Sequence, residues 1–349
     1  MIRIVNWLLT RRCNLNCDYC AIVKNYDTIP MSYPRMHHYI IHEMSTQDVI
    51  EGLEKFKQHN PNAFHIFYGG EPLLRKDLHS IITFCNNEDI HYTIISNNTE
   101  EIQPLIKKLL KKCGEIKGFT ASVDPVLVGK HPSYDRIRKS QEGFASLVEL
   151  KKHIKDVVAE ITVMPETEVN LYSIVRMLTD EGISSDITFV DIAKSPYYDF
   201  SNVVSPKELV QQSSSLRNHM QQLIDSDLDI HMKEVLLPEI WKILPSEMDC
   251  QINRSLHNVS VDADGTIRLC LRIRGIFTPD MVTLKNLFMG GGRINPIAHG
   301  AIKRDKLELC KKCNHTCQLM SKIIDDSNIG PSSLVHLDRR TAMEENKDG

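Results

Sequence analysis

The sequence has no long apolar run and no surplus of positive charge. No stretch of its 349 residues approaches the ~18 consecutive apolar residues that a transmembrane helix requires. The start, MIRIVNWLLTRRC, also lacks the cleavage site of a signal peptide. The formal net charge of −3 gives no basis for non-specific nucleic-acid binding, which needs a basic surplus. The sequence therefore predicts a cytoplasmic protein with neither a membrane nor a nucleic acid as partner.

Cysteine is present but unevenly placed. In a reducing compartment, most of the 10 cysteines are expected to be metal ligands rather than disulfides. Cys85 and Cys113 fall in or beside predicted helices, where we expect small buried hydrophobic side chains. The others form an N-terminal group and a C-terminal group: Cys13, Cys17 and Cys20, and then Cys250, Cys270, Cys310, Cys313 and Cys317.

The N-terminal group, RRCNLNCDYC, has the spacing C-x3-C-x2-C. A redox pair needs only two cysteines, whereas a structural zinc site or a cubane iron–sulfur cluster normally takes four ligands. Three thiolates on a cubane cluster would leave one iron open to water, substrate or a cofactor.

Strand-like and helix-like segments alternate over the first 195 or so residues. The strands are expected at 3–9, 63–74 (broken at Gly69-Gly70), 91–98, 118–124, 158–165 and 185–193, and the helices at 44–59, 77–86, 101–112, 141–154 and 169–181. Strict alternation predicts a parallel sheet, either an open doubly wound sheet or an incomplete barrel, with its chemistry at the carboxyl ends of the strands.

The alternation ends near residue 200, and we expect four regions: an α/β domain at 1–200, a helical connection at 201–245, a small C-terminal domain at 246–325 and a tail at 326–349. We expect two helices in the connection, at 206–225 and 230–243. The small domain contains HNVSVDADGTIRLCLRI, a β-hairpin that turns on Asp264-Gly265.

The cysteine spacing after the first strand, Tyr19 before the third cysteine and GGEP at 69–72 together resemble the radical S-adenosylmethionine (SAM) superfamily. The resemblance implies a partial (β/α)6 TIM-like barrel. It also implies a [4Fe-4S] cluster whose open iron binds SAM, and reductive cleavage of SAM to a 5′-deoxyadenosyl radical that abstracts a substrate hydrogen. A reductant protein such as flavodoxin or ferredoxin would supply the electron.

The same resemblance implies roles for individual residues. Cys13, Cys17 and Cys20 would hold the SAM cluster; Gly69, Gly70 and Glu71 would approach the methionine ammonium; Tyr19 would pack near the adenine; Ser96, Asn97 and Ser122 would contact SAM from strand ends; and Arg138 would meet its carboxylate. The alternatives are a core tyrosine, ordinary turn formers at 96–97, a solvated arginine and an incidental surface glutamate.

The C-terminal cysteines show C-x14-G-x4-C followed by CKKCNHTC, which resembles the first half of SPASM and twitch extensions. That implies one auxiliary [4Fe-4S] cluster held by Cys250, Cys270 and two or more of Cys310, Cys313 and Cys317. The alternative is a zinc site with four cysteine ligands, because the spacing suits zinc almost as well.

The substrate is expected to be a peptide or protein side chain, with a small metabolite (a sugar, nucleoside or amino acid) as the alternative. A non-catalytic iron–sulfur or zinc protein is a second alternative. Asp191 and Lys194, at the end of the sixth strand, are the candidate catalytic residues. The loop of residues 21–44 is long enough to roof the active site, or to form a packed surface flap. No leader-recognition or cobalamin-binding domain is expected before the first strand.

Overall fold

The computed structural model describes residues 2–15, 43–123, 140–163, 171–189, 214–230, 258–268 and 283–295. Its main sheet has the strand order β6-β5-β4-β3-β2-β1-β7-β8. The strands β1 to β6 pair in parallel and in sequence order. They span Ile4–Leu8, Phe64–Tyr68, His91–Ser96, Gly118–Val123, Asp156–Val163 and Ser184–Phe189. This architecture confirms the expected α/β fold, a partial barrel of six β/α units.

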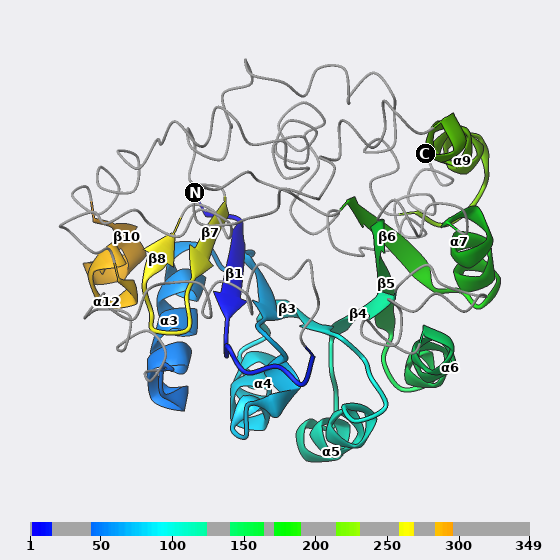
Figure 1. The fold of residues 1–349 in the computed structure, drawn as a ribbon. Coiled ribbons are helices and arrows are strands. Elements are labelled where there is room, and N and C mark those ends of the chain that lie inside the picture. Colours follow the sequence, from blue (N-terminus) through cyan, green and yellow to red (C-terminus); the bar gives the residue numbers. More distant parts are fainter. Residues whose placement is uncertain are drawn as a thin grey trace, which may run out of the picture.

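Helices cover the convex side of the curved sheet (Figure 1). They are α3 (Thr46–His59), α4 (Leu78–Asn87), α5 (Gln103–Cys113), α6 (Ser140–Lys151) and α7 (Leu171–Asp180). The space between these helices and the sheet is filled by fully buried side chains, the largest of which are Trp7, Tyr92, Phe56, Phe67 and Phe119. The core therefore lies outside the arch of strands and leaves the concave face to other residues.

Local sequence explains how the first helix begins. The Ser45 side chain accepts from the Asp48 N–H, and the Asp48 carboxylate accepts from the Ser45 N–H, which together form a capping box. Val49, Leu53 and Phe56 follow at helical spacing and are buried. α3 therefore begins within the predicted helix 44–59.

The C-terminal hairpin joins the barrel sheet, which the sequence did not predict. β7 (Asn258–Val261) pairs antiparallel with β8 (Ile267–Arg268) and parallel with β1. The turn is closed by a 2.8 Å hydrogen bond from the Gly265 N–H to the Asp262 carbonyl, and Gly265 has the positive φ of +83° that favours glycine. The predicted turn at Asp264-Gly265 is confirmed.

The remaining elements are small. α9 (Ser214–Asp225) falls within the predicted helix 206–225, and Ile230 forms an isolated bridge to Ser185. The rest of the predicted helix 230–243 lies outside the described residues. α12 (Leu284–Leu287), β9 (Phe288–Met289), the turn Gly290–Gly292 and β10 (Arg293–Ile294) follow. Within the described ranges, no helix is both long and apolar enough to cross a membrane.

Cys85 and Cys113 behave as expected of small hydrophobic residues. Cys85 is fully buried, and burial raises the pKa of its thiol. Burial also raises the pKa of the Cys113 thiol, which donates to the His79 carbonyl at 3.4 Å. Both thiols are therefore held in the protonated form, which is a poor metal ligand.

Candidate functional site

The GGEP segment runs beside the chain that leads into the first cysteine. The Gly70 N–H donates to the Thr10 carbonyl at 2.9 Å, and the Glu71 N–H donates to the Arg12 carbonyl at 2.7 Å. Cys13 is the next residue. The parallel arrangement of β1 and β2 thus brings two distant sequence motifs together at one edge of the sheet.

The two glycines are required by this close approach. A Cβ atom on Gly70 would lie 2.4 Å from the Arg12 carbonyl oxygen, and one on Gly69 would lie 2.5 Å from the Thr10 carbonyl oxygen. Any side chain at Gly69 or Gly70 would push away residues 10–12, which lead into Cys13. The predicted approach of these glycines to the methionine ammonium stays a prediction, and packing of the two main chains is a second reason for glycine.

Glu71 lies near the carboxyl ends of these strands, and none of its surface is exposed. Its carboxylate accepts from the Ser96 hydroxyl at 3.1 Å, the Asn97 N–H at 2.8 Å and the Leu73 N–H at 3.1 Å. The alternative of an incidental surface acid is therefore wrong. The carboxyl group links the GGEP segment to the end of β3, and a carboxylate is the partner that an ammonium group would require.

Donor groups point at the sulfur of Cys13. The Leu15 N–H lies 3.4 Å from Sγ, and the Asn97 side-chain amide lies 3.8 Å from it. The same amide donates to Asn14 Oδ1 at 2.8 Å, which holds it in place. Hydrogen bonds to sulfur stabilise a thiolate and tune iron–sulfur clusters. The donors from Leu15 and Asn97 therefore suit Cys13 as the first ligand of the expected cluster. Asn97 is also the residue that directly follows β3.

Ser122 lies in a polar row that crosses three neighbouring strands. Its register partner on β5 is Glu160, whose partner on β6 is Asp186. Alternation places this row on the concave face, opposite the buried Ala159 and Ile161. Burial and the nearby Glu160 carboxylate raise the pKa of Asp186 to about 7. The acidic pair was not predicted from the sequence, although Glu160 interrupts a strand that is otherwise rich in apolar residues.

The raised pKa of Asp186 gives a pH-dependent stability. The native protein keeps this proton to a higher pH than the unfolded chain, so the free energy of unfolding should fall as pH rises from about 4 to about 7. We expect a loss of about 2–3 kcal/mol between about pH 5 and about pH 8. Asp186→Asn should remove that loss, as measured by urea unfolding of the iron-loaded protein at both pH values.

Asp180→Asn is the matched control, because Asp180 is an exposed residue at the end of α7. This variant should keep the wild-type pH dependence. A wild-type slope in Asp186→Asn as well would contradict the assigned pKa.

Arg75 is a further residue that the sequence did not single out. It is 5% exposed and donates to the Leu9 carbonyl at 2.9 Å and to the Met44 carbonyl at 2.7 Å. Its guanidinium also pairs with Asp77 at 2.9 Å. Arg75 thus joins the chain before the cysteine segment to the chain after it. The signal available in the sequence was weak, since an arginine after a loop is more often exposed.

The described residues include one of the three N-terminal cysteines. The structure brings Cys13, Gly69, Gly70, Glu71, Ser96 and Asn97 together, and it places Ser122 at the end of the neighbouring strand β4. The other predicted site residues lie outside the described residues: Cys17, Tyr19, Cys20, Arg138, Asp191, Lys194, Cys250, Cys270, Cys310, Cys313 and Cys317.

Sequence comparison supports the resemblance to the radical SAM superfamily. Residues 7–178 match the model of the radical SAM superfamily. The chain is 28% identical over 97 residues to the AdoMet-dependent heme synthase of Oleidesulfovibrio alaskensis, covering 28% of this chain and 22% of that protein. It is 25% identical over 214 residues to the GTP 3′,8-cyclase of Aquifex aeolicus, covering 60% of this chain and 63% of that protein. The match thus spans less than two thirds of either relative.

Solved structures share the fold at low sequence identity. SuiB from Streptococcus suis, bound to the precursor peptide SuiA, has a TM-score of 0.59 and 12% identity, covering 92% of this chain and 73% of SuiB. The protein anSMEcpe with bound AdoMet has a TM-score of 0.57 and 14% identity, covering 96% of this chain and 98% of that one. With GGEP beside the first cysteine of C-x3-C-x2-C and residues 7–178 matched from β1 into α7, the chain is an enzyme of the radical SAM superfamily.

Proposed function

We propose that this enzyme reductively cleaves SAM at a [4Fe-4S] cluster held by Cys13, Cys17 and Cys20, and removes a hydrogen atom from a peptide or protein side chain. The observation that carries the proposal is the hydrogen-bonded contact of GGEP with the segment entering Cys13. When bound, the reduced cluster would supply the one electron that cleaves SAM into methionine and a hydrogen-abstracting 5′-deoxyadenosyl radical.

The chain's own residues would bind and orient the cluster and SAM. Asn97 donates its side-chain amide to the Cys13 sulfur at 3.8 Å and would contact the SAM ribose from the end of β3. Glu71 offers a fixed carboxylate for the methionine ammonium, while Ser122 and Arg138 would contact SAM, and Tyr19 would pack against the adenine. Asp191 and Lys194 remain the candidate substrate contacts. A flavodoxin or ferredoxin would be the reductant.

A peptide substrate is supported by the neighbours in structure. SuiB is known with its precursor peptide SuiA, and anSMEcpe with the Cp18Cys peptide. The alternative, a small metabolite, is favoured by the sequence relatives, since the GTP 3′,8-cyclase is named for a nucleotide. The concave face offers either substrate the polar row of Ser122, Glu160 and Asp186.

Deuterium transfer separates these two substrates. The reconstituted enzyme, SAM and reductant would be incubated with peptides from cells grown in deuterated medium, and separately with the small-molecule fraction of the same cells. A radical that abstracts deuterium from a substrate carries it into 5′-deoxyadenosine. We expect deuterated 5′-deoxyadenosine with the peptide fraction; its appearance with the small-molecule fraction alone would favour the alternative.

The C-terminal cysteines are proposed to form a SPASM- or twitch-like auxiliary site. Five cysteines suffice for one four-ligand cluster and not for two. We therefore expect about eight irons per chain after full reconstitution, in two sites of four. Iron near twelve, or about one zinc with iron near four, would contradict this assignment. Iron and zinc can be measured together by inductively coupled plasma mass spectrometry.

A further inference from the structure

A buried ion pair joins the cysteine segment to the C-terminal hairpin. Arg11 Nη2 lies 2.7 Å from Asp262 Oδ1, and the side chains are only 9% and 4% exposed. Arg11 lies two residues before Cys13. Asp262 is the first residue after β7, in the stretch of chain between Cys250 and Cys270. The pair therefore connects the chain that leads into Cys13 to the C-terminal hairpin through one short contact.

Asp262 is held firmly on its own side of this contact. Its N–H donates to the Thr266 carbonyl at 2.8 Å, which anchors it in the hairpin turn. Its carboxylate oxygen also accepts from the Ala263 N–H at 2.7 Å. Parallel pairing of β7 with β1 holds the whole hairpin against the barrel. The carboxylate thus presents a fixed negative charge to Arg11.

The hairpin also contacts the chain on the far side of the cysteine segment. The Ala263 carbonyl accepts from the Met44 N–H at 2.6 Å. Arg11 precedes Cys13, Cys17 and Cys20, and Met44 follows them. One turn of the hairpin therefore fixes both ends of the segment that carries the cysteines.

We infer that Arg11 and Asp262 are positioning residues through which the C-terminal third sets the geometry of the SAM-cleaving site. The inference rests on the proposed function. Removing one charge from a buried pair leaves the other uncompensated, so the remaining side chain moves toward solvent. Movement of Arg11 would carry Cys13 with it and change the environment of the cluster. Partners that orient a metal ligand typically change affinity or activity by about 10–100-fold when lost.

The test uses the iron-loaded, full-length enzyme with Asp262→Asn, which keeps the shape and removes the charge. We expect unchanged total iron and 5′-deoxyadenosine formation slowed by about 10–100-fold. The electron paramagnetic resonance spectrum of the reduced N-terminal cluster with SAM should also change. Hydrogen exchange should speed up in residues 9–15. If the ion pair only stabilised the fold, the spectrum of the cluster would not change.

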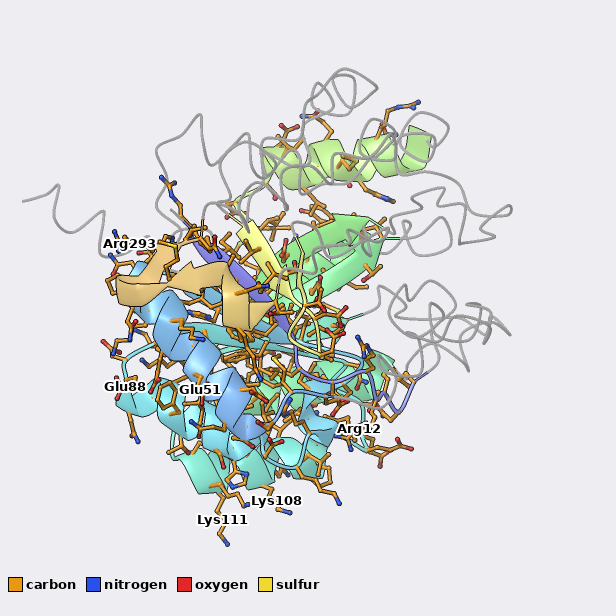
Figure 2. The ribbon with its side chains drawn as sticks, turned by 90° about the vertical axis from the view of Figure 1, so that its left-hand side faces the viewer. Arg12, Glu51, Glu88, Lys108, Lys111 and Arg293 are labelled. Carbon is orange, nitrogen blue, oxygen red and sulfur yellow. The ribbon has the colours of Figure 1, made fainter. Side chains whose placement is uncertain are left out.

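Arg11→Lys provides a second variant in case Asp262→Asn does not fold. Lysine keeps the charge and loses the fork of donors, so the slowing should be smaller and in the same direction. The control is Glu88→Gln, which breaks an exposed pair with Lys57 of 2.8 Å. Figure 2 shows Glu88 on the opposite side of the molecule from Arg12, the neighbour of Arg11 in sequence. The control should match the wild type in every measurement.

The outcomes separate this inference from the function on which it rests. A wild-type enzyme that does not cleave SAM contradicts the proposed function. A wild type that cleaves SAM, with a folded Asp262→Asn or Arg11→Lys variant of equal rate and identical spectrum, overturns the inference alone.

Discussion

Replacing Cys13, Cys17 and Cys20 together with Ala is expected to abolish 5′-deoxyadenosine formation completely. These three thiolates are proposed to hold the cluster that would supply the electron, and no other cysteine lies near them in sequence. The C-terminal cysteines belong to a separate group, so about four irons per chain should remain in the triple variant. Chromatographic quantification of 5′-deoxyadenosine, together with iron analysis, measures both results.

Cys113→Ala is the matched control for this experiment. It makes the same chemical change at a thiol that donates to the His79 carbonyl between α4 and α5, away from the carboxyl ends of the strands. That variant should keep about eight irons and cleave SAM at the wild-type rate. Retained cleavage in the triple variant would show that the N-terminal cysteines do not hold the reactive cluster.

Glu71→Ala is expected to have the second-largest effect. The change removes a buried carboxylate that accepts from Ser96, Asn97 and Leu73. We propose that the same carboxylate pairs with the SAM ammonium, so its loss should weaken SAM binding by about 1.5–3 kcal/mol. In dissociation constants that is roughly 10- to 150-fold. Isothermal titration of SAM into the reconstituted protein measures it.

Glu71→Gln separates the charge from the local packing. Glutamine keeps the volume and one acceptor oxygen, so it should preserve more of the stability than Ala does while still weakening SAM binding. Iron content should be the same in both variants, because Glu71 is not proposed to contact iron. A lower unfolding temperature with an unchanged dissociation constant would show that Glu71 only supports the fold.

The sheet and part of the site follow directly from the sequence. The alternation of strands and helices predicts β1 to β6 and their parallel order, because consecutive β/α units leave few other arrangements. The same alternation predicts that Cys13 and Glu71 meet at one edge. The preference of serine for the N-cap position accounts for the start of α3 after Ser45.

Other contacts could not be predicted in this way. The pairing of β7 with β1 joins segments about 250 residues apart, and no local pattern specifies such a partner. The same is true of Arg11 with Asp262. The pKa of Asp186 is raised by burial and by Glu160 at the same level of the next strand, and both causes exist only once the sheet is folded in this register. The hydrophobic pattern of the sequence predicts each strand, whereas the register and the long-range charge pairs are set by three-dimensional packing.

The central claim is that this chain cleaves SAM by one-electron reduction. The most direct test is to mix anaerobically reconstituted wild-type enzyme with SAM and either dithionite or reduced flavodoxin, and to quantify methionine and 5′-deoxyadenosine. Radical SAM chemistry predicts equal amounts of the two products, formed only when the reductant is present. Fully iron-loaded protein that leaves SAM intact under these conditions would contradict the claim and would favour a non-catalytic iron–sulfur or zinc protein.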